Sequence, residues 1–83
     1  LVGISSITHA NFIYDWLFEY SAHKAYESSN YVKANQDWTE LLLQNPYDPS
    51  LNYNIGLGFY QQKKYDEALS CFTRAIEHVK NNQ

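Results

Sequence analysis

The chain has 83 residues, of which 45% are hydrophobic and 18% are charged, with a formal net charge of −3 at pH 7. This size allows one small domain, and this composition excludes an intrinsically disordered chain. The sequence shows no basic stripe, which argues against a nucleic-acid partner, its single cysteine excludes an internal disulfide, and it lacks the run of about 18 apolar residues that a complete transmembrane helix needs.

Residues 1–14 are expected to form an N-terminal extension or cap. Residues 1–10 are apolar enough to be the end of a hydrophobic segment that begins before this chain, and Thr8-His9-Ala10 resembles a small-residue cleavage site. A short helix cap explains the same residues equally well, so both interpretations stay open.

Apolar residues at helical spacing predict two helices in the first half of the chain. The first covers residues 11–27, with Asn11 or Thr8 as its N-cap, and a polar turn at residues 28–30 ends it. The second covers residues 31–44. The side chains expected to face inward are Phe12, Ile13, Trp16, Leu17, Tyr20, Ala25 and Tyr26 in the first helix, and Val32, Ala34, Trp38, Leu41 and Leu42 in the second.

Two further helices are predicted in the second half. Pro46 and Pro49 interrupt the second helix, because proline cannot donate an N–H and disfavours helical geometry in the residue before it. Pro49 suits a helix start with Asp48 as its N-cap, so the third helix covers residues 49–62. After a short turn, the fourth covers residues 66–79, with an inner stripe of Ala68, Leu69, Phe72, Ala75 and Ile76. Such short connections place consecutive helices antiparallel, as two hairpins.

An internal repeat appears when the sequence is shifted by 34 residues. The shift superposes Leu17 on Leu51, Tyr26 on Tyr60, Tyr31 on Tyr65, Ala34 on Ala68, Trp38 on Phe72 and Leu42 on Ile76. A helix–turn–helix period of this length is that of the tetratricopeptide repeat. The second copy resembles this family through Ile55, Gly56, Phe59, Tyr65, Ala68, Phe72 and Ala75, and the more degenerate first copy through Ala22, Tyr31, Ala34, Trp38 and Pro46.

The resemblance implies an all-α fold in which two antiparallel helix-turn-helix hairpins stack as a short right-handed α-solenoid. Residues 15–48 would form a degenerate first repeat and residues 49–82 the second. Gly56 and Ala68 are expected to be small because the two helices of a hairpin cross closely there, while Phe59, Tyr65 and Phe72 fill the space around the crossing.

A narrower resemblance involves the segment from Phe12 to Tyr31 together with Tyr53-Asn54-Ile55-Gly56. These residues resemble the region that follows the von Willebrand A domain in bacterial Bat-type aerotolerance proteins. The resemblance implies a larger, membrane-associated bacterial parent, in which a hydrophobic segment precedes the repeats. A cytoplasmic and an envelope-associated location, including the periplasmic side, both stay open.

The sequence offers no constellation of catalytic or metal-binding residues. His9, His23 and His78 are far apart, and none stands at metal-ligand spacing to a cysteine. Cys71 lies on the fourth helix, where a packed and inert thiol is expected, and Gly56-Leu57-Gly58 lies within a helix rather than in a phosphate-binding loop. We therefore expect no enzymatic activity, no catalytic residue, no cofactor, no metal and no small-molecule substrate.

The family resemblance implies a concave surface, formed by the first helix of each hairpin, that binds a protein or peptide. The family's ligand positions fall on Trp16, Glu19, His23, Tyr26 and Glu27 in the first repeat, and on Ser50, Tyr53, Leu57, Tyr60 and Gln61 in the second. Trp16 has an alternative role, which is packing against the N-terminal extension. Glu19 and His23 stand where chaperone-tail binders carry lysine and asparagine, and only Asn54 matches, which argues against a clamp for a C-terminal carboxylate.

Charge is unevenly distributed along the chain. Residues 15–48 contain two lysines and six carboxylates, a net −4, whereas residues 49–82 contain four basic and three acidic residues, a net +1. An acidic face that prefers a basic partner and an ordinary solvated surface both explain this pattern.

The leading hypothesis for function is a protein–protein interaction module that binds a peptide or a partner protein through the concave surface. The alternative is a structural element that associates with another copy or packs against the rest of a larger, membrane-associated protein. This alternative follows because two repeats leave an apolar end uncovered.

Overall fold

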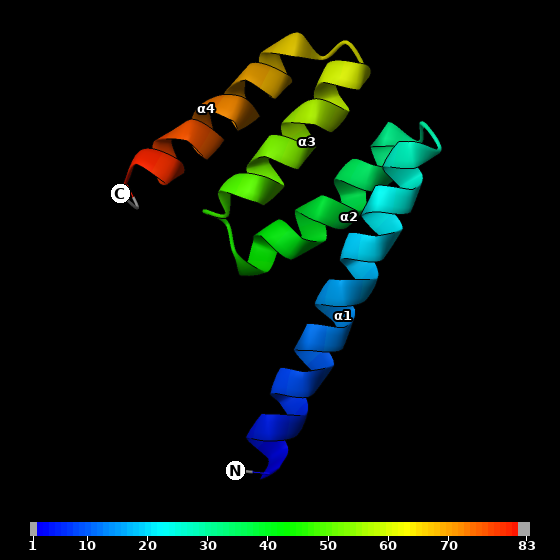
Figure 1. Ribbon diagram of the computed structural model, residues 1–83, viewed down its shortest axis with the longest axis vertical. Coiled ribbons are helices and arrows are strands. Elements are labelled where there is room, and N and C mark those ends of the chain that lie inside the picture. Colours follow the sequence, from blue (N-terminus) through cyan, green and yellow to red (C-terminus); the bar gives the residue numbers. More distant parts are fainter. Residues whose placement is uncertain (1, 82–83) are drawn as a thin grey trace.

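The computed structural model describes the backbone of residues 2–81 and the side chains of residues 13–80. This part of the chain forms four helices and no strand: α1 (Val2–Glu27), α2 (Tyr31–Gln44), α3 (Pro49–Gln61) and α4 (Tyr65–Asn81). Each helix packs on its neighbours in the sequence, so α1 lies on α2, α2 on α3, and α3 on α4. Figure 1 shows the two hairpins side by side, with the N-terminal part of α1 extending beyond α2. The predicted all-α fold of two stacked hairpins is confirmed.

The start of the first helix differs from the prediction. α1 begins at Val2 rather than at Asn11, so the backbone of the expected N-terminal extension continues the helix. Residues 2–10 contain no proline, and Thr8 and Asn11 are tolerated inside a helix whose preceding residues are also helical. The structure does not describe the side chains of Thr8 and Asn11, so their expected capping roles are not tested.

The two later helix starts follow the sequence signals. Asp48 caps α3, because its Oδ1 accepts a hydrogen bond of 3.1 Å from the backbone N–H of Leu51, and Pro49 occupies the first turn. Asn30 caps α2 by accepting a hydrogen bond of 3.3 Å from the N–H of Lys33. These polar caps satisfy backbone donors that have no partner within the helix.

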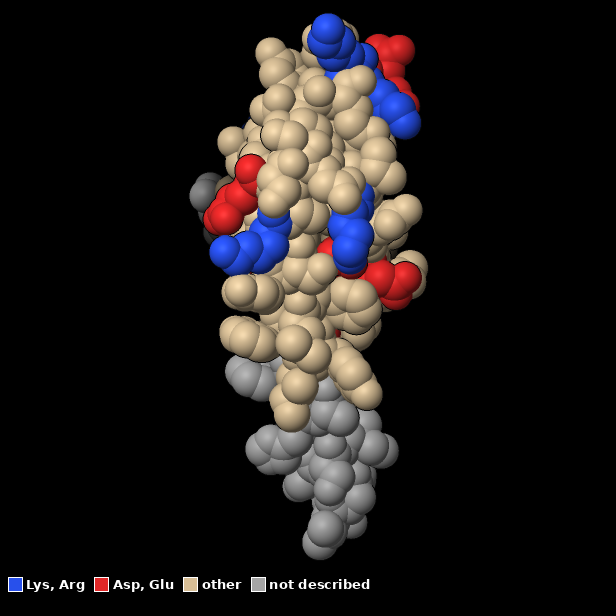
Figure 2. Space-filling model, turned by 90° about the vertical axis from the view of Figure 1, so that its right-hand side faces the viewer, with Lys and Arg blue, Asp and Glu red and all other residues tan. Residues whose placement is uncertain are grey.

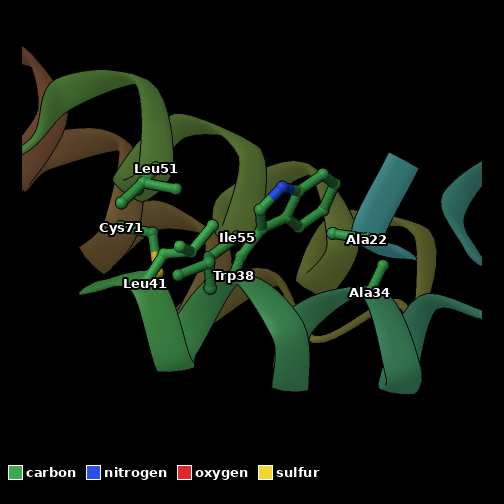
Figure 3. Close-up of a cluster of buried hydrophobic side chains, with 7 residues drawn as sticks. All are labelled: Ala22, Ala34, Trp38, Leu41, Leu51, Ile55 and Cys71. Carbon is green, nitrogen blue, oxygen red and sulfur yellow. The ribbon is translucent and has the colours of Figure 1, made fainter. Parts of the chain in front are cut away.

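The core is a small cluster between the hairpins. It consists of Ala22, Ala34, Trp38, Leu41, Leu51, Ile55 and Cys71, and Figure 3 shows how these side chains from all four helices meet around the Trp38 indole. Ala68 and Ala75 are also buried. Gly56 lies against the Phe72 ring, since a β-carbon at Gly56 would be 2.7 Å from Phe72 Cδ1. Small residues therefore stand where the helices of each hairpin approach one another.

Several apolar side chains that the sequence placed inside are exposed, which corrects the prediction. They are Ile13, Trp16, Leu17 and Tyr20 of α1, Val32 of α2, and Tyr65, Leu69 and Ile76 of α4. For the residues of α1 and α4 the reason is that these outer helices of the stack have neighbours on one side only, so apolar residues on their other side remain uncovered. The inward position expected for Phe12 lies outside the described side chains.

Polar side chains occupy interior positions that the apolar pattern did not indicate. Asp37 is buried, and it accepts hydrogen bonds from the Ser21 hydroxyl at 2.6 Å and from Lys33 Nζ at 2.9 Å. Asn52 is fully buried, and its Nδ2 donates to the carbonyl oxygens of Pro46 and Asp48 at 3.3 and 3.0 Å. These contacts tie α1 to α2 and close the connection between the hairpins.

Candidate protein-binding surfaces

The first candidate surface is a cleft between the first helices of the two hairpins, here called the α1–α3 cleft. It has a volume of about 250 Å³ and is lined by Asp15, Glu19, Leu41, Gln44, Asn45, Asp48, Ser50, Leu51 and Asn54. Three of these residues are carboxylates, and among the described residues no lysine or arginine lines the cleft. Of the predicted ligand positions, Glu19 and Ser50 lie here.

The three carboxylates of the cleft differ in the hydrogen-bond partners that they have within the described residues. Asp48 caps α3 and accepts a second hydrogen bond from Asn45 Nδ2 at 3.2 Å. Glu19 Oε2 lies 3.2 Å from Nε2 of His23, with both side chains largely exposed. Asp15 Oδ1 is shielded from solvent, and the described residues offer it no hydrogen-bond donor. Together, the three carboxylates present acceptors that suit a ligand carrying an N–H or a positive charge.

Exposed aromatic rings also lie on α1, the helix that carries Asp15 and Glu19. Trp16 and Tyr20 stack with their ring centroids 5.7 Å apart and their planes at 19°, and both remain more than half exposed. The alternative role for Trp16, packing against the N-terminal extension, stays a prediction, because it involves side chains outside residues 13–80. Flat apolar rings beside polar groups suit the anchoring of a peptide.

The remaining predicted ligand positions of the first helices take part in contacts within the chain. The His23 ring lies edge-on to Trp38, with centroids 5.6 Å apart. Gln61 Nε2 donates to the hydroxyl of Tyr26 at 3.3 Å and so links α3 to α1. Tyr60 lies against Tyr65 with centroids 5.4 Å apart. Glu27 forms an exposed ion pair with Lys24, 3.9 Å between the charged atoms.

The second candidate surface lies on the outer side of the second hairpin and is here called the α3–α4 face. A groove of about 490 Å³ is lined by Pro49, Ser50, Tyr53, Ala75, Ile76, Val79 and Lys80, and an adjoining hollow of about 360 Å³ is lined by Tyr53, Leu57, Phe72, Ala75 and Ile76. Tyr53 and Leu57, both predicted for the concave surface, therefore lie on a mainly apolar face shared with α4. Sequence reasoning missed Val79 as a surface residue and placed Ile76 in the core, although their helical spacing was visible.

The described polar clusters do not resemble a catalytic centre. The Ser21 hydroxyl donates to the Asp37 carboxylate, and Lys33 is paired with the same carboxylate, so the three groups form a structural link. Burial raises the pKa of the Cys71 thiol above its ordinary value, although Arg74 Nη2 lies 3.3 Å from the sulfur. A protonated, buried thiol is a poor nucleophile.

Two further features concern only the described part of the chain. Its His, Cys, Asp and Glu residues include no group of three or more that could hold a metal ion. Its helices include none that is both long and apolar enough to cross a membrane.

Comparison with known proteins identifies one family for part of the chain. No curated protein and no solved structure matches the chain, and nothing in these comparisons supports a Bat-type parent. A family model, that of the tetratricopeptide repeat, matches residues 50–82, which cover nearly all of α3, the following turn and α4. Repeats of this kind generally mediate protein–protein interactions. The match supports a tetratricopeptide repeat in the second hairpin, formed by α3 and α4.

Proposed function

We propose that this chain is a protein-binding module whose α1–α3 cleft binds a peptide segment carrying a lysine or arginine. The observation that carries the proposal is the lining of the cleft, in which Asp15, Glu19 and Asp48 bring three carboxylates together without a lysine or arginine among the described lining residues. The repeat match supports protein binding in general.

The charge of the cleft favours a cationic ligand over an anionic one. A carboxylate-rich wall without lysine or arginine repels a C-terminal carboxylate and attracts an ammonium or guanidinium group. Such a group would form charge-assisted hydrogen bonds with the carboxylates of Asp15 and Glu19 that line the cleft.

The test is a binding measurement with two pools of labelled peptides that differ only in carrying lysine or glutamate at fixed positions. Fluorescence anisotropy should show binding of the lysine pool, weakened about tenfold by Asp15→Asn or Glu19→Gln. Glu40→Gln is the matched control, because Glu40 is an exposed carboxylate of α2 that does not line the cleft. Equal binding of both pools, or an equal loss in the control variant, would contradict the proposal.

A second candidate function is self-assembly or docking onto a larger protein through the α3–α4 face. Exposed Ile76 and Val79 favour it, together with the groove that they line. Uncovered apolar grooves of this kind are typical of surfaces that bind a protein.

A further inference from the structure

α1 carries apolar side chains on two opposite sides. Its inner side contains Ala22, which is fully buried, and Phe18, which packs against the core. Its outer side carries Ile13, Trp16, Leu17 and Tyr20, all exposed and spaced as i, i+3, i+4 and i+7, here called the α1 stripe. Such spacing is that of a helix face that packs against another protein surface.

The charge distribution agrees with a neutral contact surface around this helix. Figure 2 shows lysine, arginine and carboxylate side chains toward the upper part of this side of the molecule, while the lowest part of the described surface, around α1, shows none. Asp15 and Glu19 lie toward the α1–α3 cleft instead.

The repeat shows what kind of surface fits the α1 stripe. Within one copy, α3 packs on α2, and Leu51 is buried in the shared core at 7% exposure. The residue 34 positions earlier is Leu17, in the α1 stripe, and it is 46% exposed. Leu17 therefore repeats, on α1 and without a partner, the position at which Leu51 of α3 packs on the first hairpin.

The other half of the same interface recurs at the opposite end of the stack. Asn35 of α2 is buried against α3, where its Nδ2 donates to the carbonyl of Ile55 at 3.2 Å. Its counterpart 34 positions later is Leu69, which is 65% exposed, and the counterpart of half-buried Leu42 is Ile76, which is 57% exposed. Counterparts of residues from both sides of this internal interface are thus exposed at the two ends of the stack: Leu17 on α1, and Leu69 and Ile76 on α4.

We propose that two copies of this chain associate head-to-tail, with the α1 stripe of one copy on the α3–α4 face of the next. This proposal rests on the second candidate function and names its partner surface. The orientation follows from the repeat correspondence, and the net charges agree with it, because head-to-tail contact brings the net −4 first half near the net +1 second half. Contact between two α1 stripes would bring two acidic halves together. A head-to-tail contact leaves one stripe and one face free, so association continues beyond a dimer unless a ring closes.

The test is light scattering across a concentration series of the 83-residue chain and three variants. Leu17→Glu blocks the stripe, Ile76→Glu blocks the face, and Leu43→Glu is the matched control at an exposed leucine of α2 outside both surfaces. The unmodified chain and the control should gain mass with concentration. Each blocked variant should need at least about tenfold more protein to associate, and a one-to-one mixture of the two should form a dimer and nothing larger.

Each outcome decides the proposal. The proposal is overturned if the unmodified chain stays monomeric at all concentrations. It is also overturned if a solution of Ile76→Glu by itself associates as the unmodified chain does, since this would indicate stripe-to-stripe contact. Association of Leu17→Glu by itself would likewise overturn it, by indicating face-to-face contact. Circular dichroism checks folding, and Trp16→Glu with Val79→Glu provides a second pair if one variant unfolds. The Ile76→Glu variant should also be tested for peptide binding to the α1–α3 cleft. Peptide binding by this variant would support the binding module even if head-to-tail association fails.

Discussion

Ser29 and Lys63 adopt the same left-handed backbone conformation, with φ of 64° and 63°, at equivalent positions after the first helix of each hairpin. The hydrogen bonds repeat as well, since the N–H of Asn30 donates to Ala25 at 2.8 Å and that of Lys64 to Phe59 at 2.9 Å. This pattern is the Schellman motif. The first hairpin, which matches the repeat weakly in sequence, therefore turns in the same way as the second.

This shared turn predicts that glycine at either position stabilises the protein. A left-handed conformation costs a residue with a β-carbon about 1 kcal/mol, and glycine avoids that cost. Lys63→Gly and Ser29→Gly should each raise the free energy of unfolding by about 1 kcal/mol in urea titrations. Lys64→Gly is the control, since φ at Lys64 is not positive. A gain in the control equal to that of Lys63→Gly would refute the explanation.

Ala68 should not tolerate a larger side chain. It is 2% exposed where α4 packs on the rest of the fold, so Ala68→Leu should lower the free energy of unfolding by roughly 1–3 kcal/mol. Ser70→Leu introduces the same side chain at an exposed site of α4 and should change stability little. Thermal or urea melts in which both variants match the unmodified protein would count against the helix crossing described above.

Gly58 and Asn35 should be energetically coupled. A β-carbon at Gly58 would overlap the Asn35 side-chain amide, so Gly58→Ala should destabilise the protein despite the higher helix propensity of alanine. In an Asn35→Ala background the overlap is gone, and Gly58→Ala should then become neutral or stabilising. A double-mutant cycle measures this coupling, and additive effects would show that the close approach is unimportant.

Cys71 should react slowly with thiol reagents while the protein is folded. The thiol is buried and its pKa is raised above 9.0, chiefly by desolvation. As the pH rises above 9.0, the thiol therefore ionises in the unfolded chain before it does so in the folded protein. The contribution of Cys71 to the free energy of unfolding should be fully present below pH 9.0 and should decrease above it. The comparison is a thiol at exposed position 70, made by Ser70→Cys with Cys71→Ala, which should react at the rate of a free thiol. Equal rates in the two proteins would contradict burial of Cys71.

The sequence predicted the parts of the fold that local chemistry determines. Asp48 with Pro49 fixed the start of α3, and the small Gly56 marked a close contact, which the structure shows with Phe72. Leu69 and Ile76 could not be assigned from the sequence, because helical spacing shows that a side is apolar and not which neighbour covers it. The burial of Asp37 was not predicted, because the hydrogen bonds that stabilise its buried carboxylate come from Ser21 of α1 and Lys33 of α2.

The candidate site was predictable only in part for a related reason. Family positions placed Glu19 and Tyr53 on one concave surface, but Tyr53 lies against Phe72 on the α3–α4 face. Asp15 was not singled out, although it precedes Glu19 by one helical turn and therefore shares its side of α1. Its shielding from solvent depends on packing that no local pattern reveals.

The most direct test of the central claim is a nitrogen-15 NMR titration of the chain with the lysine-containing peptide pool. The largest shifts should occur at the backbone amides of Asp15, Glu19 and Asn54, around the α1–α3 cleft. In Asp15→Asn the same shifts should need about tenfold more peptide. Shifts confined to Ile76 and Val79, or no shifts at all, would contradict the assignment of the cleft as a peptide-binding site.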